Sequence, residues 1–581
     1  MLDTEQAKLH INMAVVLKGS LHCEGKPINK ERQDGNKASW LICFTTTMMY
    51  AAFIPNLMNL VTYLHNIMHM DIATSSTTVS NFNGASAGFA LLGGFLTDSY
   101  ITRFKGIVIF GPLEILGYRL LALQAYLPSL QPPPCDISKQ SSNCKPVHGS
   151  NAAILNIALY IVALGEGFTR ANLPSFGGDQ FGEDEIGLRR KSSFFNWYTI
   201  GISIGGIIGL VFVVWLQNYK GWDLGFALCA AIVLLGIIVF VFGFKFYRHQ
   251  IPNGSPFTRM LQVIVAAFKK RKLPLPENED ELYEDLSKEE MLGGELLQHT
   301  KGFKFLDRAS ILNGKNGNWT LCTVTQVEEL KIILRMFPIF VSAVVAYIPL
   351  PLILTLTVQQ GGTMNNKLGK IHISPASPAS LMIIPIILQI LLIILYDRLF
   401  VPFARKITGY RTGITHLQRI AIGFISGTIA TCIAAVIEMK RKSVARDHGL
   451  IDSGDQVPMS VFWLGLQFFA LGINDAFTFV GLLEFFNSEV SKGMKSIGTA
   501  IFFCVTALTS YIGTIVVNVV NKTTSHPDTG EIGWLEGNNL NKNHLDRFYW
   551  LLTILGLVGY LNYLFWAKRY VYRRDYLVQK D

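Results

Sequence analysis

Charged residues are scarce in this sequence. Asp, Glu, Lys and Arg make up 16% of its 581 residues, whereas hydrophobic residues make up 50%. A soluble globular protein carries about 25% charged residues. The apolar surplus falls into blocks long enough to cross a hydrocarbon core, which takes about 20 residues per helix. The composition therefore excludes an ordinary soluble protein and predicts a polytopic membrane protein in contact with the lipid bilayer.

Motifs of several other protein classes are also missing. The first thirty residues lack the apolar stretch of a cleavable signal peptide. The eight cysteines show no metal-ligand spacing, and there is no phosphate-binding loop or G-x-S-x-G elbow. We therefore expect that the protein is not an enzyme and that it has no catalytic residue, no metal site and no cofactor. The net charge of +10 fits the excess of Lys and Arg in cytoplasmic loops of membrane proteins, so nucleic acid is not an expected partner.

The apolar segments number twelve and fall into two groups of six. Parallel six-helix halves are the architecture of major facilitator transporters. We therefore expect an all-α membrane protein of the major facilitator fold, with an amphipathic cytoplasmic helix at the start of the central linker. The expected parts are a tail at 1–38, a first half at 39–246, a linker at 247–330, a second half at 331–567 and a tail at 568–581. The segments are expected near 40–64, 82–100, 106–126, 152–174, 194–216, 222–246, 331–357, 377–397, 414–437, 459–486, 494–520 and 546–567.

The even number of segments places both chain ends on the same side. Short loops on that side hold more Lys and Arg than the opposite loops, which predicts cytoplasmic termini. A basic cluster within 440–446 goes against this distribution. The loop with Cys135 and Cys144 is then extracytoplasmic, where a disulfide can form. The plasma membrane is the expected location and the vacuolar membrane the alternative, while the oligomeric state is left open.

The second and eighth segments end in similar stretches, GGFLTDSYITRFKG and IILYDRLFVPFARKITG. Each stretch has an aspartate at the membrane edge, Asp98 or Asp397, followed by basic residues. We expect Asp98 and Arg103 to latch neighbouring helices on the cytoplasmic side. The alternative is that these are ordinary loop-edge charges; the recurrence in the expected half favours the latch.

Two charges, Glu166 and Arg170, lie inside the apolar run ALGEGFTRANLPSFGGDQF. A charge within a membrane span is expensive and indicates a functional site. An arginine stays charged and can bind a carboxylate or a similar anion bidentately. The i,i+4 spacing with the acid first also favours an ion pair within the helix. Two interpretations stay open: Arg170 binds an anionic substrate, or it only pairs with Glu166.

Five stretches resemble a known transporter family. Two of them resemble the two signatures of the proton-coupled oligopeptide transporter superfamily, and three are similar to its plant nitrate/peptide transporter family. The resemblance covers nearly the whole chain. GITHLQRI followed by IEMKRK, with GGFLTDSY and NLVTYL, is most similar to the subfamily associated with abscisic acid and gibberellin uptake. The five stretches are SFGGDQF at 175–181, FNWY at 195–198, CTVTQVEELKIILRMFPIF at 322–340, GITHLQRIAIGF at 413–424 and LLEFFNSEVSKGMKS at 482–496.

The resemblance implies a cavity between the halves with a basic residue on the fourth helix, here Arg170 where Lys is usual. Glu484 resembles the family's glutamate on the tenth helix, so we expect it to carry a proton or to face Arg170 as a gate partner. Asp475 on the same helix and Glu166 are further candidates for proton coupling. Glu114 and Arg119 are expected to be packing residues. The expected substrate-binding set is Arg170, Glu166, Glu484, Asn196 and Tyr50.

Two family features are missing. The E-x-x-E-R motif of the first helix, which the family ties to proton coupling, falls on 46–50, where Thr46 and Tyr50 cannot carry protons near neutral pH. The seventh-helix histidine of some nitrate carriers is replaced by Leu350. We therefore expect a secondary active transporter of a small organic anion, an abscisic acid or gibberellin-like carboxylate, with protons as an atypical or reduced coupling partner. The alternatives are a low-affinity nitrate transporter and a non-transporting sensor.

Overall fold

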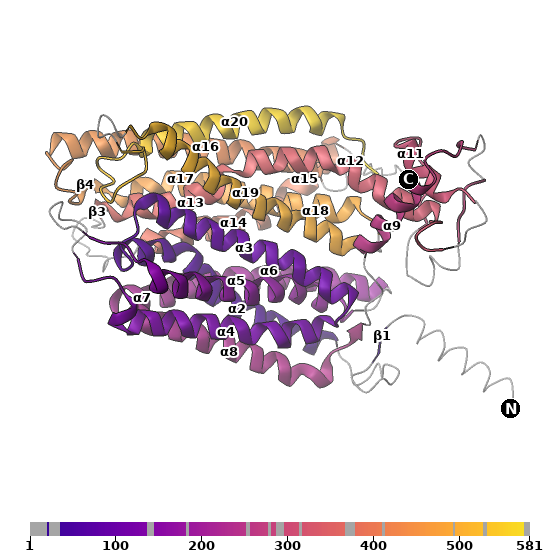
Figure 1. Ribbon diagram of the computed structural model, residues 1–581, viewed down its shortest axis with the longest axis horizontal. Coiled ribbons are helices and arrows are strands. Elements are labelled where there is room, and N and C mark those ends of the chain that lie inside the picture. Colours follow the sequence, from indigo (N-terminus) through magenta and orange to yellow (C-terminus); the bar gives the residue numbers. More distant parts are fainter. Residues whose placement is uncertain are drawn as a thin grey trace.

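The protein is a bundle of long helices that run along one axis (Figure 1). The computed structural model describes residues 20–21, 35–135, 144–181, 185–250, 256–276, 281–285, 296–312, 317–365, 378–408, 413–491, 494–526 and 532–573. In Figure 1 the helices of the first half, in indigo and purple, form one side of the bundle, and the helices of the second half, in orange and yellow, form the other.

The first half contains six spanning units. The fifth unit is α6, continued by a π-helical turn and a short helix, and the sixth is α8 with a 3₁₀ turn at its end. In chain order the elements are α2 (Gly35–Asn66), α3 (Ile72–Ser99), α4 (Arg103–Tyr126), the 3₁₀ turn η1 (Pro128–Leu130), α5 (Gly149–Gly178), α6 (Glu185–Ile208), η2 (Gly209–Val213), α7 (Val214–Tyr219), α8 (Trp222–Phe242) and η3 (Gly243–Phe246).

The second half also contains six spanning units, several of them interrupted. Proline at the first position of α13 breaks the first unit, and π-helical turns interrupt the second and fourth. The elements are α12 (Val324–Tyr347), α13 (Pro349–Gly362), η6 (Pro378–Met382), α14 (Ile383–Leu395), η7 (Tyr396–Phe400), α15 (Val401–Thr408), α16 (His416–Asp447), η8 (Val461–Leu464), α17 (Gly465–Asn474), η9 (Asp475–Phe479), α18 (Val480–Glu489), α19 (Lys495–Thr524) and α20 (Leu545–Arg569).

Short elements complete the described chain. The linker holds α9 (Pro256–Lys269), α11 (Lys304–Asp307) and the turn η5 (Arg308–Ser310). Two small strand pairs, β1 (Ser20–Leu21) with β2 (His249–Gln250) and β3 (Met364–Asn365) with β4 (Val457–Ser460), are antiparallel and parallel respectively.

The helix α3, second in the chain, completes the set of twelve spanning units although its composition is polar. In the part of the chain that the structure describes, eleven helices are long and apolar enough to cross a membrane, and α3 is not among them. It packs against α5 and α19 within the bundle, and its hydroxyls bond back to its own carbonyls, Thr77 to Ala73 and Ser80 to Ser76. The predicted start of this segment near residue 82 was wrong, because α3 begins at Ile72. The polar run TSSTTVSNFN is typical of a loop, but in a helix its hydroxyl groups can bond to backbone carbonyls of the preceding turn.

The linker begins with α9, in the stretch where an amphipathic helix is expected. Val263, Ala266 and Ala267 are buried in a cluster with the start of α12. The opposite face exposes large apolar side chains at helical spacing: Phe257, Leu261, Ile264 and Phe268. Figure 1 places α9 at one end of the bundle, near the end of α20, and β3 and β4 at the other.

The two halves meet along α3, which packs against α19 and α13. Polar side chains join the halves near the β3–β4 end. Ser76 bonds to Thr355, Thr514 donates to Asn81 at 2.8 Å, and Asn83 donates to Ser510 at 3.5 Å. We call these three pairs the gate contacts. They hold the halves together at the end opposite α9.

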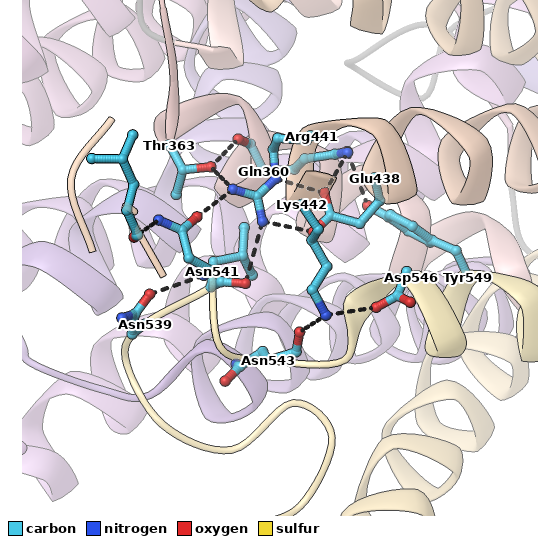
Figure 2. Close-up of polar contacts among 12 residues, drawn as sticks. Gln360, Thr363, Glu438, Arg441, Lys442, Asn539, Asn541, Asn543, Asp546 and Tyr549 are labelled. Carbon is cyan, nitrogen blue, oxygen red and sulfur yellow. Dashed lines mark hydrogen bonds and ion pairs between the residues drawn. The ribbon is translucent and has the colours of Figure 1, made fainter. Parts of the chain in front are cut away.

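The basic cluster that contradicted the loop-charge distribution lies on α16 rather than in a loop. Arg441 is fully buried, and its guanidinium donates two bonds to Glu438, at 2.7 and 2.8 Å. It also donates to Thr363, Asn541 and the Leu540 carbonyl, as Figure 2 shows. Lys442 donates to the Asn543 carbonyl and to Asp546. These cations are paired inside the fold, so they do not act as free loop charges.

Removing one partner of the Arg441–Glu438 pair should destabilise the protein strongly. Arg441→Met leaves Glu438 buried without its cation, which costs about 3–5 kcal/mol. A lowered thermal unfolding midpoint of the purified protein in detergent is the measurement. Arg446→Gln, an exposed arginine on the same helix, is the matched control and should change stability by less than about 0.5 kcal/mol. Equal midpoints for the two variants would contradict a structural role for the network.

Candidate functional site

Arg170 lies on α5 at the meeting of the two halves. Its guanidinium carbon is 5.8 Å from the ring centre of Phe53 on α2 and 5.4 Å from that of Phe503 on α19. Phe53 belongs to the first half and Phe503 to the second. Contacts of this kind attract a cation to the ring face and contribute about 0.5–2 kcal/mol. They leave the hydrogen-bonding edge of the guanidinium available for an anion.

A set of hydroxyl groups occupies the place of the missing E-x-x-E-R motif. Tyr50 and Tyr198 of α6 interact electrostatically with Arg170. Both Tyr50 and Thr46 lie at the positions of the lost charges on α2. The residues that replace the motif are therefore neutral, and they do not cancel the charge of the arginine.

Glu166 does not form the expected ion pair with Arg170. Glu166 is buried, and within the described residues neither of its carboxylate oxygens has a hydrogen-bond partner. The Nη1 atom of Arg170 likewise has none there. The helical spacing permits the pair, but the guanidinium lies over the two phenylalanine rings instead. Glu166 therefore acts on Arg170 only through longer-range electrostatics.

Asp475 is the deeper of the two acids on the tenth spanning unit. It begins the π-helical turn η9 and accepts a bond from the side chain of Asn474 at 3.3 Å. It also interacts electrostatically with Tyr347 of α12. π-Helical turns frequently occur at functional sites. Asp475 is half-buried, whereas Glu484 is exposed.

Glu484 pairs with Arg419 and not with Arg170, which corrects the expected gate partner. The Arg419 guanidinium donates to the Glu484 carboxylate at 2.8 Å, and His416 lies 3.5 Å from it. The Glu484 side chain is 44% exposed. Arg419 and His416 both lie on α16, which packs against α18 in the second half. The pairing of Glu484 therefore stays within one half.

Arg419 is a site residue that the sequence reasoning missed. It also donates to the Ala476 carbonyl at 3.3 Å and lies 4.5 Å from the ring centre of Tyr396. Arg419 therefore ties together α16, the π-helical turn and α18. The sequence does contain a signal for Arg419, since it is a cation one turn into the apolar segment of GITHLQRIAIGF. That stretch was used only for the family resemblance.

The latch residues lie at the α9 end of the first half. Arg103 donates to Asp98 at 2.8 Å and also pairs with Asp179. Asp179 is the acid of SFGGDQF and caps the end of α5. Three helices, α3, α4 and α5, therefore share one guanidinium. Asp397 lies in η7 and Asn196 in α6, but their side chains are outside the described residues.

Cys135 and Cys144 form a disulfide in the loop between α4 and α5. A group of possible metal ligands, His299, Asp307 and Glu328, lies in the linker region. The Lys331 ammonium, fully buried, is 2.7 Å from both Asp307 and Glu328. It supplies the positive charge that these carboxylates need, so the group is explained as an ion-pair cluster.

Comparison with known proteins decides the family. A model of the POT family matches residues 104–535. The chain belongs to the POT family. Protein NRT1/PTR FAMILY 4.5 of Arabidopsis thaliana is 39% identical over 556 residues, covering 93% of this chain and 94% of the relative. Protein NRT1/PTR FAMILY 3.1 of the same plant is 39% identical, covering 89% and 87%.

Solved structures show the same fold. An auto-inhibited POT family peptide transporter has a TM-score of 0.67 at 17% identity, covering 93% of this chain and 99% of that chain. A POT family transporter in complex with 5-aminolevulinic acid has a TM-score of 0.62 at 11% identity, covering 92% and 97%. The expected major facilitator fold is confirmed. The protein is a multi-pass membrane transporter of a proton-coupled family, related to the plant nitrate/peptide transporters, and not an enzyme.

The gate contacts predict a site for reversible locking. Cysteines at Ser76 and Thr355, whose hydroxyls bond to each other, should form a disulfide under oxidation. Because the halves must separate there for the cavity to open at that end, the oxidised double variant should lose transport and regain it on reduction. Thiol labelling measures the disulfide, and counterflow of the substrate measures transport.

A double variant with cysteines at Thr77 and Thr355 is the control. Thr77 is the next residue on α3, and its hydroxyl bonds to Ala73 within its own helix. This variant should transport equally in both redox states. Full transport by the oxidised Ser76–Thr355 variant, with its disulfide verified, would rule out opening of the halves at this end.

Proposed function

We propose that this protein is a plasma-membrane transporter, with cytoplasmic termini, for a small organic anion such as abscisic acid or a gibberellin-like carboxylate. Arg170 is the observation that carries the proposal. It is a charged group at the junction of the halves, in electrostatic interaction with Tyr50 and without a contact carboxylate among the described residues. A carboxylate of the substrate supplies the missing negative charge and can accept two bonds from the guanidinium.

The groups around Arg170 favour an anion with an apolar body. Phe53 and Phe503 flank the guanidinium. Leu350, which stands where some nitrate carriers have histidine, lines a small cavity within the second half together with Tyr347, and Tyr347 interacts electrostatically with Arg170. A peptide also needs acids for its amino end, and the first-helix acids are replaced by Thr46 and Met49. Burial of an apolar ring system against these side chains adds affinity that a bare nitrate lacks.

Proton coupling in this proposal runs through acids other than those of the E-x-x-E-R motif. Glu166 is the acid nearest to Arg170 along the chain, and the two interact electrostatically. Asp475 is a second, half-buried acid on the opposite half. Glu484 is engaged by Arg419, which makes it a contact within one half and a weaker candidate for the moving proton.

The test is uptake by the purified protein in liposomes at two external pH values. Abscisic acid, gibberellin, nitrate and a dipeptide are compared as substrates. We expect uptake of the hormone carboxylates, faster with an acidic exterior. Uptake of the dipeptide alone would contradict the proposed substrate class, uptake of nitrate alone would favour the nitrate alternative, and absence of all flux would favour the sensor.

Arg170→Ala should abolish uptake of the accepted anion, because the charge that binds it is gone. Arg170→Lys should retain part of the uptake, since the lysine keeps the charge but not the two-bond geometry. Arg119→Ala, an exposed arginine on α4, is the matched control and should transport normally. Near-normal uptake by Arg170→Ala with normal yield of folded protein would place the anion site elsewhere.

A further inference from the structure

A second buried glutamate lies beside Glu166. Glu114 on α4 is fully buried, and within the described residues neither of its carboxylate oxygens has a hydrogen-bond partner. The two helices touch at this level, since a Cβ added to Gly165 would lie 2.5 Å from the Glu114 backbone nitrogen. Glu166 follows Gly165 directly, and the two carboxyl groups interact electrostatically. The glycine thus brings together two acids from adjacent helices.

Two ionised carboxylates are not stable in such a place. A buried charge without hydrogen-bond donors costs several kcal/mol, and like charges at close range disfavour each other. Paired carboxyl groups in proteins avoid this cost by sharing a proton between them. We propose that Glu114 and Glu166 form a proton-binding carboxyl pair, which replaces the first-helix acids and is linked to the anion site through Arg170. The linkage to transport rests on the proposed function; the proton-binding pair itself does not.

The groups around the pair come from every helix packed against it. The cation among them is Arg170, which acts on Glu166. Ser86 on α3 packs its backbone against Gly167, and its buried hydroxyl has no partner among the described residues. The remaining titratable groups that act on the pair or on its members are hydroxyls and a thiol: Tyr118 on α4, Tyr50 on α2, Tyr198 on α6 and Cys229 on α8. None of these carries a charge near neutral pH, so Arg170 decides which carboxyl holds the proton.

The position of Arg170 assigns the two acids different roles. With the anion site empty, the guanidinium favours ionised Glu166, and Glu114 on the far helix holds the proton. When an anion binds Arg170, it offsets the positive charge that Glu166 senses, and Glu166 takes up a second proton from the water of the cavity. The only bond formed is O–H, and it breaks again when the anion leaves. Anion and proton binding therefore strengthen each other reciprocally.

Infrared spectroscopy of the substrate-free protein in lipid vesicles tests the pair. We expect a C=O band of a buried protonated carboxyl at neutral pH that shifts in heavy water. The band is then followed as the pH rises. In Glu114→Gln the remaining band should disappear at a lower pH than in the wild type, because Arg170 favours the ionised form of Glu166, whereas Glu166→Gln should keep the band of Glu114. Adding Arg170→Gln to Glu114→Gln should move this disappearance back to a higher pH. The return distinguishes proton binding from a merely structural effect.

Glu484→Gln is the matched control, because the Arg419 cation keeps that carboxylate ionised, and the band should not change. Size-exclusion profiles verify that each variant is folded. A band in Glu114→Gln that disappears at the same pH as in the wild type, or a band lost in Asp475→Asn instead, would overturn the pair. Since no substrate is used, failure of abscisic acid uptake would refute the proposed function without affecting this result.

Discussion

The constraint on which the site depends is a positive charge held inside an apolar bundle. Moving such a charge out of water costs several kcal/mol unless nearby groups compensate it. Around Arg170 the compensation is only partial: two aromatic faces, a tyrosine hydroxyl and a distant carboxylate. The part of the positive charge that these groups do not compensate favours an anion beside Arg170. The neutral residues at 46–50 leave that charge uncompensated, whereas acids there would neutralise it permanently.

Three other arginines of the bundle show what full compensation looks like. Arg441 has a bidentate carboxylate and three further acceptors, and Arg103 and Arg419 each contact at least one carboxylate. These three fix helices to one another, at the ends of the bundle or within one half. Arg170 differs because its ring contacts come from both halves. The same residue type is thus used for structure where it is paired, and at Arg170 it is left without a carboxylate contact among the described residues, as the proposed anion site requires.

The fold could be predicted from the sequence, and Arg170 could be singled out as a candidate, since both depend on local patterns. Apolar blocks define membrane helices whatever surrounds them, and Arg170 stands out within its own segment. The partners of Glu484 and Glu114 could not be predicted in this way, because each meets a residue on another helix. Their meeting depends on packing details such as Gly165, which lets α4 approach α5. The start of α3 could not be predicted from its polar sequence either, because the hydroxyl groups find their hydrogen-bond partners only once the helix forms.

The gate contacts are weak enough for the proposed binding of an anion at Arg170 to separate the halves. They are hydrogen bonds between neutral hydroxyl and amide groups, each with a net worth of about 1 kcal/mol because water replaces them when they break. A closed end held by ion pairs as strong as that of Arg441 would need far more energy to open. Phe53 and Phe503 touch the same guanidinium from opposite halves, so an anion that draws Arg170 away from either ring changes a contact between the halves. Two hydrogen bonds from a guanidinium to a carboxylate, at about 1.5–3 kcal/mol each, would match the sum of the three gate contacts. On the proposed function, alternation between two open states is therefore energetically accessible.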